Sequence, residues 1–161
     1  MAARADDSGR MNVEFQIATS AEQAVQEADV IVTATTSSVP VFQGSQVTAG
    51  THVNAIGAFT PETRELDSSL IQAAKLVVDT RAGCLEEAGD LLIPLGEQRI
   101  TEADFDCELG ELAAGSRPGR SDAAQITVFK SVGSAAFDVV AALEVCRSAE
   151  RLGLGQPLEL P

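Results

Sequence analysis

The sequence has few of the residues that build metal sites, disulfide frameworks or nucleic-acid interfaces. It contains one histidine, His52, and three cysteines, Cys84, Cys107 and Cys146, which lie far apart and form no CxxC pair. This pattern supports neither a zinc site nor a disulfide framework, and it indicates a reducing cytosol. Basic residues are also scarce, because 11 Lys and Arg stand against 24 Asp and Glu. The resulting net charge of −13 disfavours a nucleic-acid partner.

Long apolar runs are missing as well. No stretch approaches the roughly 18 apolar residues of a membrane-spanning helix. The opening residues, MAARADDSGR, also lack the apolar core of a signal peptide. We therefore expect a cytoplasmic protein without a membrane partner. Tryptophan and tyrosine are absent, but the hydrophobic content of 45 % is ordinary for a globular chain, and 161 residues fit one domain.

What the sequence does contain is an alternation of strand-like and helix-like patterns. Strands are expected at 13–18, 29–36, 51–57, 76–80 and 125–133, and helices at 19–28, 65–75, 81–89, 101–114 and 134–153. The continuous apolar run at 29–36 is typical of a strand covered on both faces. Pro94 predicts a break, and Gly153 followed by Pro157 predicts the end of the last helix. Alternating strands and helices predict an α/β fold with a mostly parallel sheet.

Three predicted strand ends are candidates for ligand contact: TATTSS after Val32, AIGAFTP after Asn54 and KSVGSA after Phe129. In open parallel sheets, ligands bind beyond the carboxyl ends of the strands. Small residues and glycines let backbone N–H groups approach a ligand, and the start of the last helix favours anions. Turn chemistry alone leaves the alternative that these loops are ordinary βα turns.

The charged residues near these loops also have plainer interpretations. Lys130 is a candidate for ligand contact, although a lysine beside a strand end is usually a solvated side chain. His52 lies at a strand start and is expected to be structural or exposed. The acidic residues Glu86, Glu87 and Asp90 are expected to form a solvated helix face.

Glycine is frequent, with 13 residues, but the G-x-G-x-x-G turn of a dinucleotide-binding domain is not among them. A strand, helix and strand are present, whereas the phosphate-binding first βαβ unit is not. We therefore expect a loose lead-in at 1–12, a partial dinucleotide-binding domain at 13–153 and a tail at 154–161.

Several blocks of the sequence carry a resemblance to a known family. The blocks are ADVIVTATTSSVPVF, GTHVNAIGAFTPETRELD, VVDTRAGCLEEAGDLL, ELGELAAGSRPGR and ITVFKSVGSAAFDVVAA, in this order. They resemble the C-terminal, dinucleotide-binding portion of the ornithine cyclodeaminase/mu-crystallin family. GAFTPETREL and EAGDLLIP are most similar to its Δ1-pyrroline-2-carboxylate (ketimine) reductase branch.

The resemblance implies a Rossmann-type parallel sheet flanked by helices, paired in the complete protein with a separate substrate and dimerisation domain. It implies NADPH or NADH as cofactor and a small cyclic imino acid as substrate, reduced to proline or pipecolate by a homodimer. The family's cofactor contacts fall here on Thr33, Ala34, Thr35, Asn54, Ala55, Ile56, Gly57, Lys130 and Ser131. Its substrate contacts fall on Phe59, Val132 and Gly133.

Phe59 separates the activities within this resemblance. Cyclodeaminases of the family carry an aspartate at the matching position, and a phenylalanine cannot transfer a proton. The substitution favours reductase over ornithine cyclodeaminase, because hydride transfer tolerates an apolar wall. A non-catalytic, mu-crystallin-like binding protein and an alanine dehydrogenase remain alternatives.

The family's catalytic acid belongs to the N-terminal domain, so the resemblance assigns no catalytic residue and no metal ligand here. We therefore interpret the chain as the C-terminal portion of a reductase whose first βαβ unit and N-terminal domain are absent. Its unpaired sheet edge predicts self-association or marginal stability of the isolated chain.

Overall fold

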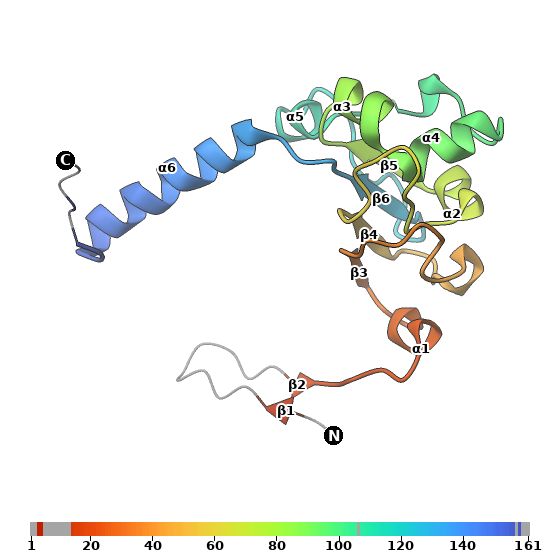
Figure 1. Ribbon diagram of the computed structural model, residues 1–161, viewed down its shortest axis with the longest axis horizontal. Coiled ribbons are helices and arrows are strands. Elements are labelled where there is room, and N and C mark those ends of the chain that lie inside the picture. Colours follow the sequence, from red (N-terminus) through yellow and green to blue (C-terminus); the bar gives the residue numbers. More distant parts are fainter. Residues whose placement is uncertain (1–2, 5–13, 106, 157, 159–161) are drawn as a thin grey trace.

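The fold is built on a four-stranded sheet in which all neighbouring strands are parallel (Figure 1). The computed structural model describes residues 3–4, 14–105, 107–156 and 158. The strands lie in the order β3 (Val30–Thr33), β4 (His52–Ala55), β6 (Thr127–Lys130) and β5 (Lys75–Val78). Their register places the last residues of all four strands level with one another. The predicted α/β fold with a parallel sheet is therefore confirmed.

The remaining elements are short except for the last helix. They are β1 (Ala3–Arg4), β2 (Glu14–Phe15), α1 (Ala21–Val25), η1 (Gly44–Gln46), α2 (Ser68–Ala73), α3 (Arg81–Glu87), α4 (Gly89–Gly96), η2 (Glu102–Asp104), α5 (Leu109–Ala113) and α6 (Ala135–Leu152). β2 pairs antiparallel with β1 and is not part of the main sheet. Residues 1–2 and 5–12 of the predicted lead-in, 13 and 106 of the predicted domain, and 157 and 159–161 of the predicted tail lie outside the described residues.

One face of the sheet carries the core of the molecule. Side chains from alternate strand positions, among them Ile31, Val53 and Val128, are buried beneath α2, α3 and α4, which gather on that side in Figure 1. Capping side chains fix the first residues of two of these helices. Asp67 accepts a hydrogen bond from the Leu70 N–H at the start of α2, and Thr80 accepts one from the Gly83 N–H at the start of α3. We call this the covered face.

The predicted break at Pro94 is wrong, because Pro94 lies inside α4. Proline removes one backbone donor from a helix. Here Pro94 is buried together with Leu91 on the side of α4 that faces the core. Burial of these side chains offsets the missing hydrogen bond, and the helix continues to Gly96.

The opposite face of the sheet is largely open. Val30 and Val32 are 58 % and 60 % exposed, so the prediction that strand 29–36 is covered on both faces is wrong within the described chain. Leu109 and Leu112 of α5 close one side of a hollow of about 460 Å³, which also contacts Phe129. β3 is an edge strand of this sheet in the described part of the chain. We call this the open face.

The last helix extends away from the sheet in Figure 1. α6 begins and ends close to the predicted positions, and Gly153 closes it in the left-handed conformation with φ of 65°. None of its residues is buried, and its apolar side chains, including Phe137, Val140 and Leu143, are exposed. No helix in the described part of the chain combines the length and the apolar content needed to cross a bilayer.

Candidate functional site

Most of the predicted site residues lie at the carboxyl edge of the sheet, in three loops that follow β3, β4 and β6, and the others, Thr33, Asn54, Ala55 and Lys130, lie in the last residues of these strands. We call residues 34–37, 56–59 and 131–134 the tip loops. They are linked by backbone hydrogen bonds, because the Ile56 N–H donates to the Thr33 carbonyl over 3.0 Å and the Ser131 N–H donates to the Ala55 carbonyl over 3.2 Å. Ile56 and Phe59 are exposed and give this edge an apolar surface.

A buried carboxylate joins the first two tip loops. Glu65, with an exposed fraction of 0 %, accepts the N–H of Thr35 over 2.5 Å and the N–H of Gly57 over 2.8 Å. Burial alone would raise the pKa of Glu65, but the donors from Thr35 and Gly57 outweigh it, and the pKa lies below its ordinary value. Glu65 is therefore an ionised acceptor that holds the two loops together.

The contact between the two loops, and not the approach of a ligand, explains why position 57 is a glycine. A Cβ at position 57 would lie 2.4 Å from the backbone nitrogen of Thr35 and 2.5 Å from Oε1 of Glu65. No real side chain fits at such distances. The glycine therefore allows the loops after β3 and β4 to touch each other.

A buried ion pair holds the second tip loop, residues 56–59, in place. The Nζ of Lys130 lies 2.9 Å from Oδ2 of Asp90 and donates to the carbonyl of Ala58 over 2.5 Å. Oδ1 of Asp90 accepts the N–H groups of Glu65 and Leu66. Asp90 is fully buried, so the prediction that it lies on a solvated helix face is wrong, and Lys130, at 1 % exposed, is not the solvated side chain that was the alternative to ligand contact.

The Lys130 side chain therefore contacts the protein and not the outer surface of the tip loops. Its contribution to a ligand would be through the backbone and through the loop that it holds. Thr33 and Ala55 are likewise buried on the covered face. Asn54 points to the open face, where its Oδ1 lies 3.3 Å from Nε2 of His52.

A second buried carboxylate, that of Asp79 at the end of β5, holds the third tip loop. Oδ2 of Asp79 accepts the Ser131 hydroxyl over 2.8 Å, the Val132 N–H over 2.9 Å and the Gly133 N–H over 3.1 Å. Oδ1 accepts the Thr80 N–H over 2.6 Å. Burial raises the pKa of Asp79, but these donors, led by the Ser131 hydroxyl, bring the pKa below its ordinary value.

Cys84 completes this cluster and is not a candidate nucleophile. Its thiol is buried and donates to Oδ1 of Asp79 over 3.3 Å. Burial, followed by the nearby charge of Asp79, raises the pKa of the Cys84 thiol far above its ordinary value. A thiol that stays protonated cannot act as a nucleophile.

The hydrogen bonds at this edge determine which chemical groups it can receive. The N–H groups of Thr35, Gly57, Val132 and Gly133 already donate to Glu65 or Asp79. The single proton of the Ser131 hydroxyl is also used, because it is donated to Asp79. These groups are therefore not free to bind a phosphate, and the expectation that tip-loop N–H groups approach a ligand does not hold for them. The exposed apolar side chains of Ile56 and Phe59 favour contact with an uncharged ring.

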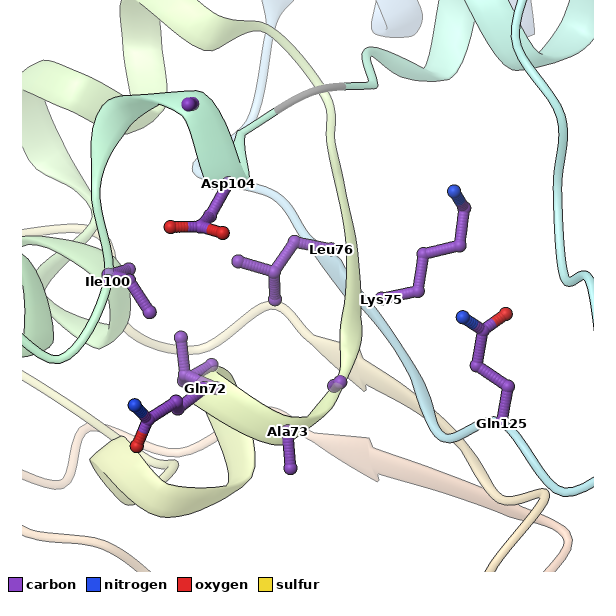
Figure 2. A pocket seen from close by; sticks show the side chains of 10 residues that line it. Gln72, Ala73, Lys75, Leu76, Ile100, Asp104 and Gln125 are labelled. Atoms are coloured by element: carbon purple, nitrogen blue, oxygen red, sulfur yellow. The ribbon is translucent and has the colours of Figure 1, made fainter.

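Another hollow lies away from the tip loops, near the amino ends of β5 and β6. It has a volume of about 250 Å³ and is lined in part by Gln72, Ile100 and Asp104 (Figure 2). Figure 2 shows Lys75 and Gln125 apart from these side chains, across the strand. This hollow contains none of the predicted site residues. Within the described ranges, no group of three or more His, Cys, Asp or Glu side chains could hold a metal ion.

Sequence reasoning missed the three acids that organise the site. Glu65 was placed at a helix start, Asp90 on a solvated face and Asp79 within a strand. A usable signal for Asp79 was its place directly after the buried run LVV, since an acid there must find donors. Glu65 and Asp90 gave weaker signals, because their donors come from residues distant in the sequence.

Comparison with known proteins identifies relatives of this chain. The profile of the ornithine cyclodeaminase/mu-crystallin family matches residues 2–152. Delta(1)-pyrroline-2-carboxylate reductase from Bacillus cereus is 40 % identical over 151 residues, which cover 93 % of this chain and 46 % of that protein. Ketimine reductase mu-crystallin from Mus musculus is 41 % identical over 129 residues, covering 80 % of this chain and 38 % of that protein.

A solved structure is similar to this chain in both fold and sequence. Delta(1)-pyrroline-2-carboxylate reductase from Thermococcus litoralis, in complex with NADH and L-proline, superposes with a TM-score of 0.78 at 40 % identity, covering 86 % of this chain and 43 % of that one. The chain thus spans less than half the length of these relatives. On the match over residues 2–152, this chain belongs to the ornithine cyclodeaminase/mu-crystallin family.

Proposed function

We propose that this chain forms the nicotinamide-binding part of a cytoplasmic, homodimeric NAD(P)H-dependent reductase of cyclic ketimine acids. The products would be cyclic amino acids such as proline or pipecolate. The observation that carries the proposal is the apolar edge formed by the tip loops, with Ile56 and Phe59 exposed beside backbone that is held by buried carboxylates. The relatives that share this chain's sequence are named as reductases of such imines.

The nicotinamide end of the proposed cofactor would lie at this edge. When bound, NADH or NADPH would supply a hydride from its nicotinamide ring to the C=N carbon of the protonated imine, which becomes a neutral secondary amine. The tip loops receive the uncharged ring, because their N–H groups at Thr35, Gly57, Val132 and Gly133 are already used. These four N–H groups would therefore not bind the pyrophosphate.

The protein's contribution at this edge is to orient the ring and exclude water. Phe59 is 56 % exposed here and offers an apolar wall without a proton to transfer. A dry wall protects the imine from hydrolysis. The absence of a proton donor at position 59 favours hydride transfer over deamination.

The experiment uses the longest natural protein that contains this chain. Δ1-Pyrroline-2-carboxylate or Δ1-piperideine-2-carboxylate is added with NADH or NADPH, and oxidation of the cofactor is followed by its fluorescence. We expect turnover with an imino acid and none with ornithine. Binding of the cofactor without oxidation would instead indicate a ligand-binding protein, and activity only with alanine and NAD⁺ would indicate a dehydrogenase.

Variants of Phe59 test the role of the wall. Phe59→Leu keeps an apolar side chain and should retain turnover within about threefold, since one apolar contact is exchanged for another. Phe59→Asp places a charge beside the ring and should lower kcat by at least about tenfold. Equal activity of both variants would show that position 59 does not face the reacting atoms.

A further inference from the structure

The third tip loop depends on one side chain from another strand. β5 and β6 are neighbours, and their register places Val78 level with Lys130. Asp79 follows Val78 directly, and its Oδ2 receives three donors from residues 131–133. The Asp79 N–H also donates to the carbonyl of Lys130 over 3.0 Å. The conformation of Ser131, Val132 and Gly133 is therefore fixed by Asp79.

The loop needs such an anchor because its own backbone does not select one conformation. Gly133 has φ of 92°, and a Cβ at that position would meet no atom within 4 Å. Glycine loses more conformational freedom on ordering than any other residue. The Gly133 N–H donates to two acceptors, Oδ2 of Asp79 at 3.1 Å and the hydroxyl oxygen Oγ of Ser131 at 3.1 Å.

We propose that Asp79 is a positioning residue for hydride transfer, which acts by fixing the Ser131–Gly133 loop against the nicotinamide ring and the imine. The inference rests on the proposed function, because it takes this loop as the border between ring and substrate. Asp79 itself is 3 % exposed, and its carboxylate accepts hydrogen bonds from Thr80 and Ser131. Its effect on the reaction is through the loop.

The geometry requires a carboxylate at position 79. A carboxylate has only acceptors, whereas the amide of asparagine has one acceptor and one donor group. In Asp79→Asn, the NH₂ group would face either the Thr80 N–H or the donors of the third tip loop. One set of hydrogen bonds is lost in both orientations. The variant keeps the shape of the side chain but cannot hold the loop and the Thr80 N–H at the same time.

Asp67 provides a matched control elsewhere in the molecule. Its carboxylate accepts three donors, from Gly44, Ser69 and Leu70, over 2.6–2.8 Å, which is as many as Oδ2 of Asp79 accepts. Burial raises the pKa of Asp67, but these donors outweigh it, and the pKa lies below its ordinary value, as for Asp79. None of its partners belongs to a tip loop. Asp67→Asn therefore reports the cost of losing a similar carboxylate that has only a structural role.

The test compares Asp79→Asn with Asp67→Asn in the longest natural protein that contains this chain. The measurements are kcat, the dissociation constant of NADH and the isotope effect on kcat with deuterium at the transferred position. We expect kcat of Asp79→Asn to fall about 10- to 100-fold, because small misplacement of reacting groups has effects of this size. Its NADH affinity should change less than kcat, with an isotope effect no smaller than in the wild type. Asp67→Asn should keep kcat within about twofold.

Ser131→Ala keeps the test decisive if Asp79→Asn fails to fold. It removes one donor to Asp79 and the Oγ acceptor of the Gly133 N–H, but it leaves the bonds from Val132 and Gly133 to Asp79, so we expect a smaller fall in kcat, of about threefold to tenfold. In a folded Asp79→Asn protein, adding Ser131→Ala should cause little further loss, because both changes release the same loop. Unchanged kcat in Ser131→Ala would count against the proposal.

The possible outcomes separate the two proposals. No turnover by the wild-type protein with any imino acid would overturn the proposed function, and this inference with it, before any variant is compared. Turnover by the wild type with equal losses in Asp79→Asn and Asp67→Asn would overturn the positioning role alone. A selective loss of kcat in Asp79→Asn supports both.

Discussion

The two faces of the sheet differ in how completely this chain buries their apolar side chains and pairs their charged ones. On the covered face, an ion pair between Lys130 and Asp90 is fully buried and each partner has further hydrogen bonds. On the open face, Val30 and Val32 remain more than half exposed. α6 likewise buries none of its residues. The chain therefore carries its own structure for the tip loops, while the open face and α6 offer apolar surface for further contacts.

The strongest way to disturb the covered face is to remove its buried cation. Lys130→Met leaves the Asp90 carboxylate buried without its partner, and we expect a loss of about 3–5 kcal/mol in the free energy of unfolding. Denaturant titration at neutral pH measures this loss. Adding Asp90→Asn should recover part of it, because an amide oxygen can still accept the N–H groups of Glu65 and Leu66.

Lys75→Met is the control for the open face. Lys75 begins β5 on that side of the sheet and is only partly buried. Its replacement should change the free energy of unfolding by less than about 0.5 kcal/mol. Comparable losses for the two lysines would show that the faces do not differ as described.

A second large effect is expected where α4 meets the loop after β4. A Cβ at Gly89 would lie 2.0 Å from the carbonyl oxygen of Thr63 and 2.6 Å from that of Thr60. Gly89→Ala forces the backbone apart and should cost about 1–3 kcal/mol, as overpacking does. At the other end of α4, a Cβ at Gly96 would meet nothing within 4 Å. Gly96→Ala should be neutral or stabilise by up to about 1 kcal/mol. Thermal melts of the two variants compare them directly.

The sequence predicts the regular parts of the fold well, for a physical reason. β3, β4, β5, β6 and α6 lie within or close to the expected ranges, because apolar runs and helix ends are local signals. The positions of the predicted site residues at one sheet edge follow from parallel strands alone. What the local pattern cannot give is the partner of a buried charge. Lys130 and Asp90 are 40 residues apart in the chain, and Glu65 reaches Thr35 across 30 residues.

The acid sensitivity of the covered face should reflect its ionised carboxylates. The pKa of Glu65 lies below its ordinary value of 4.5, so its ionised form stabilises the folded protein. That contribution is complete above the ordinary value and is lost as the pH falls through the lower pKa of the folded state. Glu65→Gln should cost about 1–3 kcal/mol at pH 7 and should flatten the loss of stability below pH about 4.5.

Denaturant titrations at several pH values between about 3 and 7 measure this slope. Glu102→Gln is the control, since Glu102 is an exposed residue of η2. It should leave the free energy of unfolding within about 0.5 kcal/mol of the wild type. An unchanged slope in Glu65→Gln would mean that the carboxylate is not ionised in its contact with the tip loops.

The smallest effect on stability is expected in α6. Val140 is 65 % exposed, and replacing it removes no buried contact within the described chain. Val140→Gln should therefore change the free energy of unfolding by less than about 0.5 kcal/mol. It should nevertheless reduce self-association of the isolated chain in sedimentation experiments, because exposed apolar surface promotes association. Arg147→Gln on the same helix should leave association unchanged. A loss above about 1 kcal/mol for Val140→Gln would show that α6 packs on the open face in solution.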